Sequence, residues 1–302
     1  MPFTPGLVHT PLTPFSANGV DFDRYGRMIE FHLQCGAEAL ALPMHCGESV
    51  SLTDAERRAV ISFAVERADK RAPIIAHVSD AGTGIAAALA KHAQAAGARA
   101  IIATTPYYWT PPPAMILEHF FQIGAAVDLP FFVLNAPEDM AGSKINAELA
   151  RKLIAKLPNF AGVVDASLDW QFMIELLTDA APVRPDFALL AGAELMVSAG
   201  AIGASGLFSA LAVIAPKLVR DLFDLCRGQK FSEARALQEE AAALRQIVKP
   251  GGVAALKAAA RAMGRDCGNP RSPLLPLDAG AEKKLAAELA ALPALAAEPR
   301  GW

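Results

Sequence analysis

The chain has 302 residues, of which 53% are hydrophobic and 20% are charged, and its net charge is −3. A chain of this length permits one large domain or two ordinary ones, and its core is large enough to be stable without disulfides or metals. The slightly acidic balance gives no electrostatic support for nucleic acid or an anionic membrane as a partner.

The cysteines are few, scattered and without C-x-x-C spacing, which is typical of free thiols in a reducing compartment. They are Cys35, Cys46, Cys226 and Cys267. The first 15 residues lack the basic segment and apolar run of a secretory signal. The apolar run at 199–215 is interrupted by glycines and is short for a membrane span. We therefore expect a soluble, cytoplasmic protein.

Short apolar runs recur along the chain at fairly regular spacing. They lie at 6–12, 38–44, 72–78, 98–105, 129–135, 160–166, 187–192 and 205–210. Continuous apolar character over so few residues is typical of parallel strands that are buried on both faces. The segments between them have helical patterns, most clearly at 54 onward, 83–96, 113–126, 146–156, 168–179 and 211–227.

The ends of several helices can be placed from single residues. Thr53 precedes a helical pattern and suits an N-cap, while the alanine-rich helix at 83–96 ends at Gly97. Eight strands alternating with helices indicate an α/β fold of the (β/α)₈ TIM barrel type rather than an open doubly wound sheet. No G-x-G-x-x-G follows the first strand, so dinucleotide binding has little support.

The strand pattern stops after residue 228. Segments 231–247, 251–264 and 280–292 read as helices separated by glycine and proline. The sequence thus predicts a barrel at 1–228 and a C-terminal helical appendix at 229–302 that packs on the barrel.

Active-site residues of such barrels stand at the carboxyl ends of the strands and on the loops that follow. Polar and ionisable side chains gather at these places in this chain. They are His9, His45, Cys46, Glu48, His77, Asp80, Tyr107, Tyr108, Asn135 and Asp165. The barrel mouth is therefore the predicted site of a small-molecule ligand.

Six motifs keep the order and spacing of a known family over nearly the whole chain. They are TPLTPFSANGVDFD (10–23), CGESVSLTDAER (46–57), TTPYY (104–108), NAP (135–137), GVVDASLD (162–169) and LKAAARAMG (256–264). The chain resembles the dihydrodipicolinate synthase and N-acetylneuraminate lyase family of class I aldolases. The resemblance implies a lyase barrel with a helical appendix, which assembles as a homo-oligomer, a dimer or a tetramer.

The resemblance also exposes a missing amine. Members of the family form a Schiff base between a lysine on the sixth strand and a 2-oxo acid, and GVVDAS places Val164 at that lysine. A valine has no lone pair and cannot form an imine. Leu134 replaces the family's tyrosine before Asn135, and 138–139 is Glu-Asp where the synthase branch commonly has a carboxylate-binding arginine. Lys144 is the nearest substitute, on the loop after the fifth strand.

Four residues are the candidates for catalysis without that amine. His45 and Cys46 follow the second strand, where the family has threonines, and an imidazole can raise the thiolate fraction of a nearby thiol. Tyr108 resembles the family tyrosine that acts across a dimer interface, and Asp165 is a carboxylate at a strand end. Structural alternatives remain open: a loop replacement at His45 and Cys46, an interface aromatic at Tyr108, and an ion-paired carboxylate at Asp165.

A second set is expected to line the ligand site, namely His77, Asn135, Gly192, Phe208 and Val164. His77 stands where the family has a small residue, and it either contacts the ligand or fills the space left by the lysine. His45, His77 and Asp165 have side chains of a kind that bind zinc, but they lack a metal-binding spacing, so no metal and no cofactor is expected.

Two hypotheses follow for the function. The first is a lyase-like enzyme that acts on a small polar or carbonyl metabolite without a Schiff base and is not a true dihydrodipicolinate synthase. The alternative is a catalytically silent barrel that binds or senses a small molecule. Convergence of His45, His77 and Asp165 on one cavity would favour the first, and an apolar mouth would favour the second.

Overall fold

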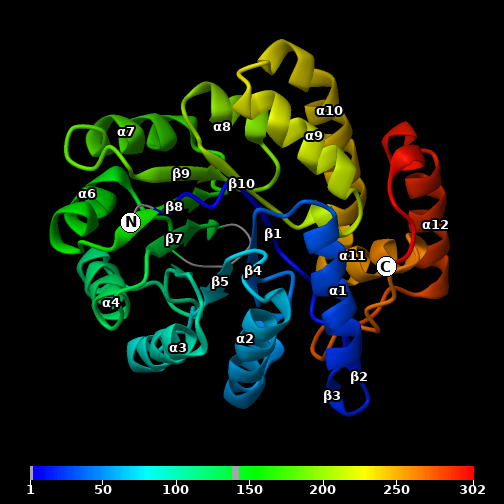
Figure 1. The fold of residues 1–302 in the computed structure, drawn as a ribbon, viewed down its shortest axis with the longest axis horizontal. Helices are drawn as coiled ribbons and strands as arrows, with labels where there is room; N and C mark the ends of the chain where they lie inside the picture. The colour runs from blue at the N-terminus through cyan, green and yellow to red at the C-terminus, as the bar shows by residue number, and fades with distance from the viewer. Residues whose placement is uncertain (1–2, 138–142) are drawn as a thin grey trace.

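Eight parallel strands close into a barrel in the computed structural model, which describes residues 3–137 and 143–302 (Figure 1). In barrel order they are β1 (Leu7–His9), β4 (Ala39–Leu42), β5 (Ile74–His77), β6 (Ala100–Thr104), β7 (Phe131–Asn135), β8 (Phe160–Asp165), β9 (Ala188–Ala191) and β10 (Gly206–Ser209). β10 pairs with β1 and completes the closure. The predicted (β/α)₈ barrel is confirmed.

Helices follow the strands and surround the barrel (Figure 1). They are α1 (Phe22–Gln34), α2 (Asp54–Ala68), α3 (Thr83–Ala96), α4 (Pro113–Ala125), α6 (Ala147–Lys156), α7 (Trp170–Ala180), α8 (Met196–Ala201) and α9 (Pro216–Arg227). No bounds were predicted for two of them, α1 and the short α8, and the hairpin of β2 (Phe15–Ser16) and β3 (Gly19–Val20) was not predicted. No helix within the described residues is long and apolar enough to cross a membrane.

The sequence signals for helix ends correspond to real caps. Thr53 accepts from the Glu56 backbone N–H at 3.2 Å, and Glu56 Oε2 accepts from the Thr53 backbone N–H at 2.9 Å. Gly97 ends α3 with φ 96°, a left-handed conformation that glycine adopts without a steric cost. The helix predicted at 211–227 is divided, because Pro216 is accommodated in the first turn of α9 after a short 3₁₀ turn at Leu211–Val213.

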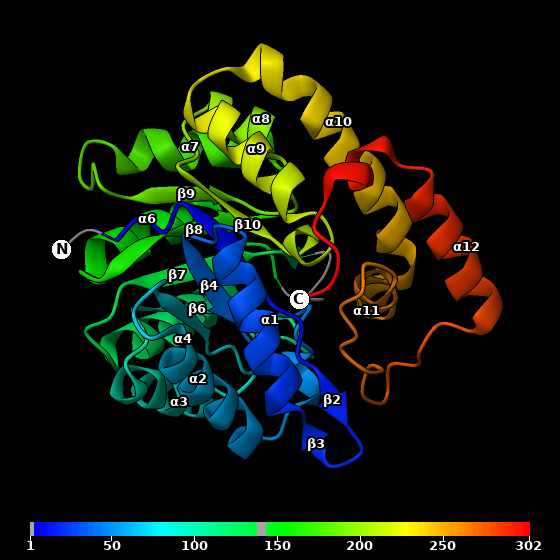
Figure 2. The same cartoon turned by 45° about the vertical axis from the view of Figure 1, so that its right-hand side comes forward.

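The C-terminal extension consists of α10 (Phe231–Val248), α11 (Gly252–Ala262) and α12 (Ala279–Ala290). Figure 2 shows these helices gathered on one side of the barrel, and α10 packs along α9. The helical extension is confirmed, whereas a domain boundary at residue 228 stays a prediction.

One buried arginine joins this extension to the barrel. Arg265 is fully buried, and its guanidinium donates to the backbone carbonyls of Val213 at 3.0 Å and Ile214 at 3.1 Å. It also donates to the carbonyls of Pro299 at 2.8 Å and Gly301 at 3.0 Å. Burial lowers the pKa of Arg265 to about 10, so the group stays charged at neutral pH. The charge is stabilised by backbone dipoles of both parts of the chain.

We expect Arg265→Met to lower the free energy of unfolding by about 3 kcal/mol, because four carbonyls, two of them on the buried residues Val213 and Ile214, lose their donor. Urea unfolding followed by circular dichroism measures the change. Arg235→Met, on the exposed face of α10, is the control and should change stability by less than about 0.5 kcal/mol. Equal stabilities of the two variants would contradict this role for Arg265.

Candidate active site at the barrel mouth

A cavity of about 130 Å³ opens at the carboxyl ends of the strands, where barrel enzymes bind their ligands. Most of its wall is apolar. The lining residues are Thr10, Met44, His45, Cys46, Leu134, Ala136, Val164, Ala166, Gly192, Ala193, Glu194, Phe208, Ala210 and Arg245. Four of the predicted site residues besides Val164 are in this set: His45, Cys46, Gly192 and Phe208.

Val164 presents hydrocarbon to the cavity from the carboxyl end of β8. It is 1% exposed, and in the sheet it lies beside Leu134 of β7 and Leu190 of β9. No lysine of the described residues lines this cavity. The position that the family resemblance assigns to an amine therefore has aliphatic neighbours as well as an aliphatic side chain.

The remaining lysines near the barrel are engaged elsewhere. Lys144 is about half exposed and forms an ion pair with Asp169 at the start of α7. Lys257 of α11 is buried, and its Nζ lies 2.6 Å from Glu48 Oε1. Neither lysine contributes to the cavity wall, so the structure gives no support for Lys144 as a substitute nucleophile.

Asp165 follows Val164 on β8 and does not line the cavity. Successive side chains of a strand point to opposite faces, so an inward Val164 turns Asp165 away from the barrel axis. Its Oδ1 accepts from Asn135 Nδ2 at 2.6 Å, and Ser167 Oγ donates to Oδ1 and Oδ2 at 3.0 and 3.1 Å. Burial raises the pKa of Asp165, and these hydrogen bonds oppose the rise. Asn135 also accepts from the Ile145 N–H, which ties the network to the loop after β7.

His77 is likewise absent from the cavity wall. Its Nε2 and Ser79 Oγ are 2.7 Å apart, and Ser79 Oγ accepts from the Thr104 N–H at 2.8 Å. Burial lowers the pKa of His77 to about 3, so the ring is neutral at physiological pH. Through Ser79 it belongs to a buried hydrogen-bond chain that joins the ends of β5 and β6.

His45 and Cys46 stand side by side but differ in environment. His45 is exposed at the rim, whereas Cys46 is buried. The Cys46 thiol donates to the Thr10 carbonyl at 3.4 Å and lies 3.3 Å from Thr10 Oγ1. Burial raises the pKa of Cys46 to about 11, so the thiol stays protonated and is a poor nucleophile at neutral pH.

Tyr108 lies on the loop between β6 and α4, away from the cavity. Its side chain is 96% exposed, and its φ of 82° is in the left-handed region. The described residues contain no cluster of three or more His, Cys, Asp or Glu placed to hold a metal ion. His45, His77 and Asp165 do not line one common cavity. Residues 138–140, where the family's carboxylate-binding arginine was expected to be absent, lie outside the described residues.

Two charged residues of the cavity wall were not among the predicted site residues. Glu194 is 2% exposed, and its Oε1 accepts from Ser209 Oγ at 2.7 Å and from the Leu211 N–H at 3.2 Å. Its Oε2 lies 3.4 Å from Nη1 of Arg245, which comes from α10. Ala193 and Glu194 have φ values of 56° and 58°, an uncommon pair of left-handed residues that aims Glu194 at this network. Arg245 is distant in sequence from every strand, which explains why it was overlooked.

The loop that carries His45 is held by a buried ion pair with the extension. Glu48 Oε1 contacts Lys257 Nζ, and Glu48 Oε2 accepts from the Arg271 backbone N–H at 2.7 Å. Lys257 also donates to the Asn269 carbonyl at 3.1 Å. Burial lowers the pKa of Lys257, and the adjacent Glu48 carboxylate opposes this effect. Glu48 is thus an orienting residue of its loop.

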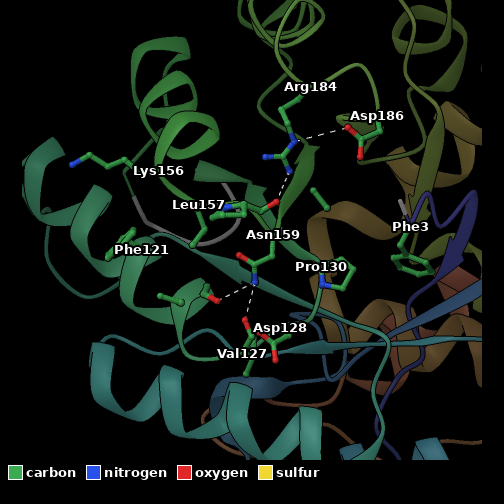
Figure 3. A pocket seen from close by; sticks show the side chains of 14 residues that line it. Phe3, Phe121, Val127, Asp128, Pro130, Lys156, Leu157, Asn159, Arg184 and Asp186 are labelled. Atoms are coloured by element: carbon green, nitrogen blue, oxygen red, sulfur yellow. Dashed lines mark hydrogen bonds and ion pairs between the residues drawn. The ribbon is translucent and has the colours of Figure 1, made fainter. Parts of the chain in front are cut away.

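A larger hollow of about 730 Å³ lies at the opposite end of the barrel, among residues that precede β7 and β8 (Figure 3). Its polar groups are engaged with backbone. Asn159 donates to the carbonyls of Gly124, Val127 and Leu129, and Arg184 donates to those of Pro158 and Phe160. This end of a barrel serves stability rather than chemistry, so the smaller cavity is the candidate site.

Comparison with known proteins agrees with the geometry. A family model described as "Dihydrodipicolinate synthetase family" matches residues 4–292. The chain belongs to this family. The 4-hydroxy-tetrahydrodipicolinate synthase of Acetivibrio thermocellus is similar, with 30% identity over 87% of this chain and 88% of that protein. An uncharacterized DapA-like lyase of Halobacterium salinarum is 32% identical over 95% of this chain and 93% of its own length.

Solved structures of dihydrodipicolinate synthetase family members share the whole architecture. Dihydrodipicolinate synthase from Aquifex aeolicus has a TM-score of 0.90 at 27% identity, covering 95% of this chain and 97% of that one. DapA-2 from Bacillus anthracis has a TM-score of 0.90 at 26% identity, covering 96% and 99%. The family membership inferred from sequence motifs is thereby confirmed, and the lyase class is that of the family.

The buried ion pair leads to a stability prediction. We expect Lys257→Met to lower the free energy of unfolding by about 3–5 kcal/mol, because it leaves the Glu48 carboxylate buried without its cation. The double variant Glu48→Gln, Lys257→Met should recover part of this loss. Urea unfolding of the four proteins of the cycle measures the coupling, and additive losses would show that the two groups act independently.

The neutral buried histidines lead to a prediction about pH. Burial lowers the folded-state pKa of His9 and His77 to about 3 and that of His119 to about 4. The unfolded chain therefore binds more protons between pH 4 and 6.5, so stability falls as pH drops below 6.5. From pH 7.5 to 5.5 each histidine should cost about 1 kcal/mol.

Urea unfolding at the two pH values measures this loss. His77→Gln should remove about one histidine's share of the pH dependence, because glutamine does not titrate. Identical pH dependence in His77→Gln and the unmodified protein would refute the assignment.

Proposed function

We propose that this member of the dihydrodipicolinate synthetase family binds a small polar or carbonyl metabolite non-covalently at the barrel mouth and acts on it as a lyase without a Schiff base. The observation that carries the proposal is Val164 in the cavity wall, with no lysine among the other described lining residues. It is then not a true dihydrodipicolinate synthase, although its relatives include proteins of that name.

The size of the cavity restricts the ligand. An engineered cavity of about 150 Å³ in another protein holds benzene, a molecule of six heavy atoms. The cavity here is about 130 Å³. A metabolite of three or four carbons with polar substituents is the size that fits.

His45 is the proposed acid–base group. It lines the cavity, is exposed to solvent at the rim and is an imidazole, the side chain best suited to proton transfer near neutrality. Cys46 is proposed as a hydrogen-bonded wall residue, because its thiol is protonated. Asp165 and His77 support β8 and β5 from outside the cavity.

A catalytically silent binding barrel is the second candidate. Two observations favour it: His77 and Asp165 do not join His45 at the cavity, and the wall is largely apolar, with Met44, Leu134, Val164 and Phe208 all nearly inaccessible. Such a wall selects a ligand by shape but offers few groups that move protons. The lyase stays the first proposal because the relatives of this chain include proteins named as a synthase and a lyase.

We further propose that the protein works in the cytoplasm as a homo-oligomer. The cysteines are free thiols, consistent with a reducing compartment. Tyr108 and Trp109 are exposed on the loop before α4, where a second copy would cover them.

Borohydride trapping with pyruvate tests the absence of imine chemistry. We expect no mass increase of the intact protein, because the described lining residues of the cavity include no lysine. A family member that keeps the strand-six lysine is the positive control, and peptide mapping locates any adduct. Reduction of pyruvate onto a lysine of the cavity would refute the proposal.

Turnover distinguishes the enzyme from the silent barrel. Three- and four-carbon oxo and hydroxy acids are incubated with the protein, and cleavage is followed by proton NMR. For a substrate that is cleaved, His45→Gln should lower kcat by about 10²–10⁴-fold, whereas Cys46→Ser should change it less than tenfold. Saturable binding without any turnover would select the silent alternative.

A further inference from the structure

We infer that Arg245, on the C-terminal helix α10, is the anion anchor of the barrel mouth, so that the ligand carries a carboxylate. The inference deepens the proposed function and depends on non-covalent binding at that cavity. Arg245 lies outside the strand-end positions that hold most of the candidate groups.

The position of Arg245 supports this role. It lines the mouth cavity of about 130 Å³ and also a neighbouring hollow of about 210 Å³ between α10 and the loop after β9. Ala193 is the other residue shared by the two spaces. Arg245 therefore forms part of the partition between an inner and an outer compartment, with its side chain about one-third exposed.

The existing partner of Arg245 leaves donors for a ligand. Glu194 Oε2 contacts only Nη1, at 3.4 Å, a long contact that is not bidentate. A guanidinium has five N–H donors, and among the described residues no other hydrogen bond from Arg245 is found. Two donors suffice for the parallel pair of bonds by which arginine binds a carboxylate.

An anionic ligand can bind beside Glu194 because donors other than Arg245 stabilise the Glu194 carboxylate. Ser209 Oγ and the Leu211 N–H donate to Oε1, so the carboxylate does not rely on Arg245 alone. Glu194 then orients the guanidinium while the ligand takes the unused donors.

Because the rest of the described wall is largely apolar, binding of an anion at this cavity depends on Arg245. Leu134, Val164 and Phe208 cannot stabilise a negative charge, and the part of the wall that the structure describes contains no lysine. Arg245 is the only arginine in the described wall of the cavity. A ligand that presents its carboxylate to α10 and its carbonyl or methyl end to β7 and β8 matches this distribution.

Binding of an isosteric pair tests the inference. The probes are pyruvate and pyruvamide, which have the same number of heavy atoms and differ in charge, and calorimetry and ligand-observed NMR measure Kd. The intact protein should bind pyruvate at least tenfold more tightly than pyruvamide. Arg245→Gln should weaken pyruvate binding about 10- to 100-fold, the range for a lost charge-assisted hydrogen bond, and leave pyruvamide binding within threefold.

Two further variants separate a direct contact from a structural effect. Arg235→Gln removes a charge from the exposed face of the same helix and should behave as the unmodified protein. Arg245→Gln combined with Glu194→Gln leaves no buried carboxylate unpaired, and it should still lose the preference for pyruvate.

The inference would be overturned if Arg245→Gln kept the preference for pyruvate over pyruvamide. It would also be overturned if the intact protein bound both probes equally, or bound neither at 10 mM. These outcomes differ from a borohydride adduct, which would instead overturn the non-covalent chemistry.

Discussion

The alternation of side chains along β8 determines what the barrel mouth can do. Inward residues of this strand face the ligand space, and the inward residue at its carboxyl end is Val164. Asp165 must then face outward, where Asn135 and Ser167 hold it. β8 thus contributes neither an amine nor a carboxylate to the cavity wall, and the polar side chains of the described wall come from the loops after β1, β4 and β9 and from α10.

The buried polar groups of the molecule divide into those that hold the scaffold and those that face the ligand. His77 with Ser79 and Asp165 with Asn135 are hydrogen-bonded pairs, and Glu48 with Lys257 is an ion pair. Their contribution is to fix loops and strand ends, since a buried polar group without a partner is costly. What remains for a ligand is His45 at the rim and Arg245 on the wall.

Much of the architecture was predictable from the sequence because continuous apolar runs identify parallel strands. The helices whose bounds were not predicted are short or interrupted: α8 has six residues, and α1 contains Gly26. Family membership was predictable because its motifs cover the chain.

The site was predictable only in part, since His45, Cys46, Gly192, Phe208 and Val164 line the cavity while His77, Asn135, Asp165 and Tyr108 do not. Strand alternation alone would have placed Asp165 outside once Val164 was placed inside. Arg245 could not be found in this way, because the contact joins residues 51 positions apart.

The ion pair between Glu48 and Lys257 joins α11 to the loop after β4, and Arg245 brings α10 to the cavity that this loop lines. A fragment that stops after α9 would lack the cation that neutralises Glu48, the arginine at the cavity wall and the donor that bridges to Val213. Gene truncations or domain grafts of the eight-stranded part alone would therefore leave Glu48 without its buried cation and the mouth without the Arg245 side chain in its wall.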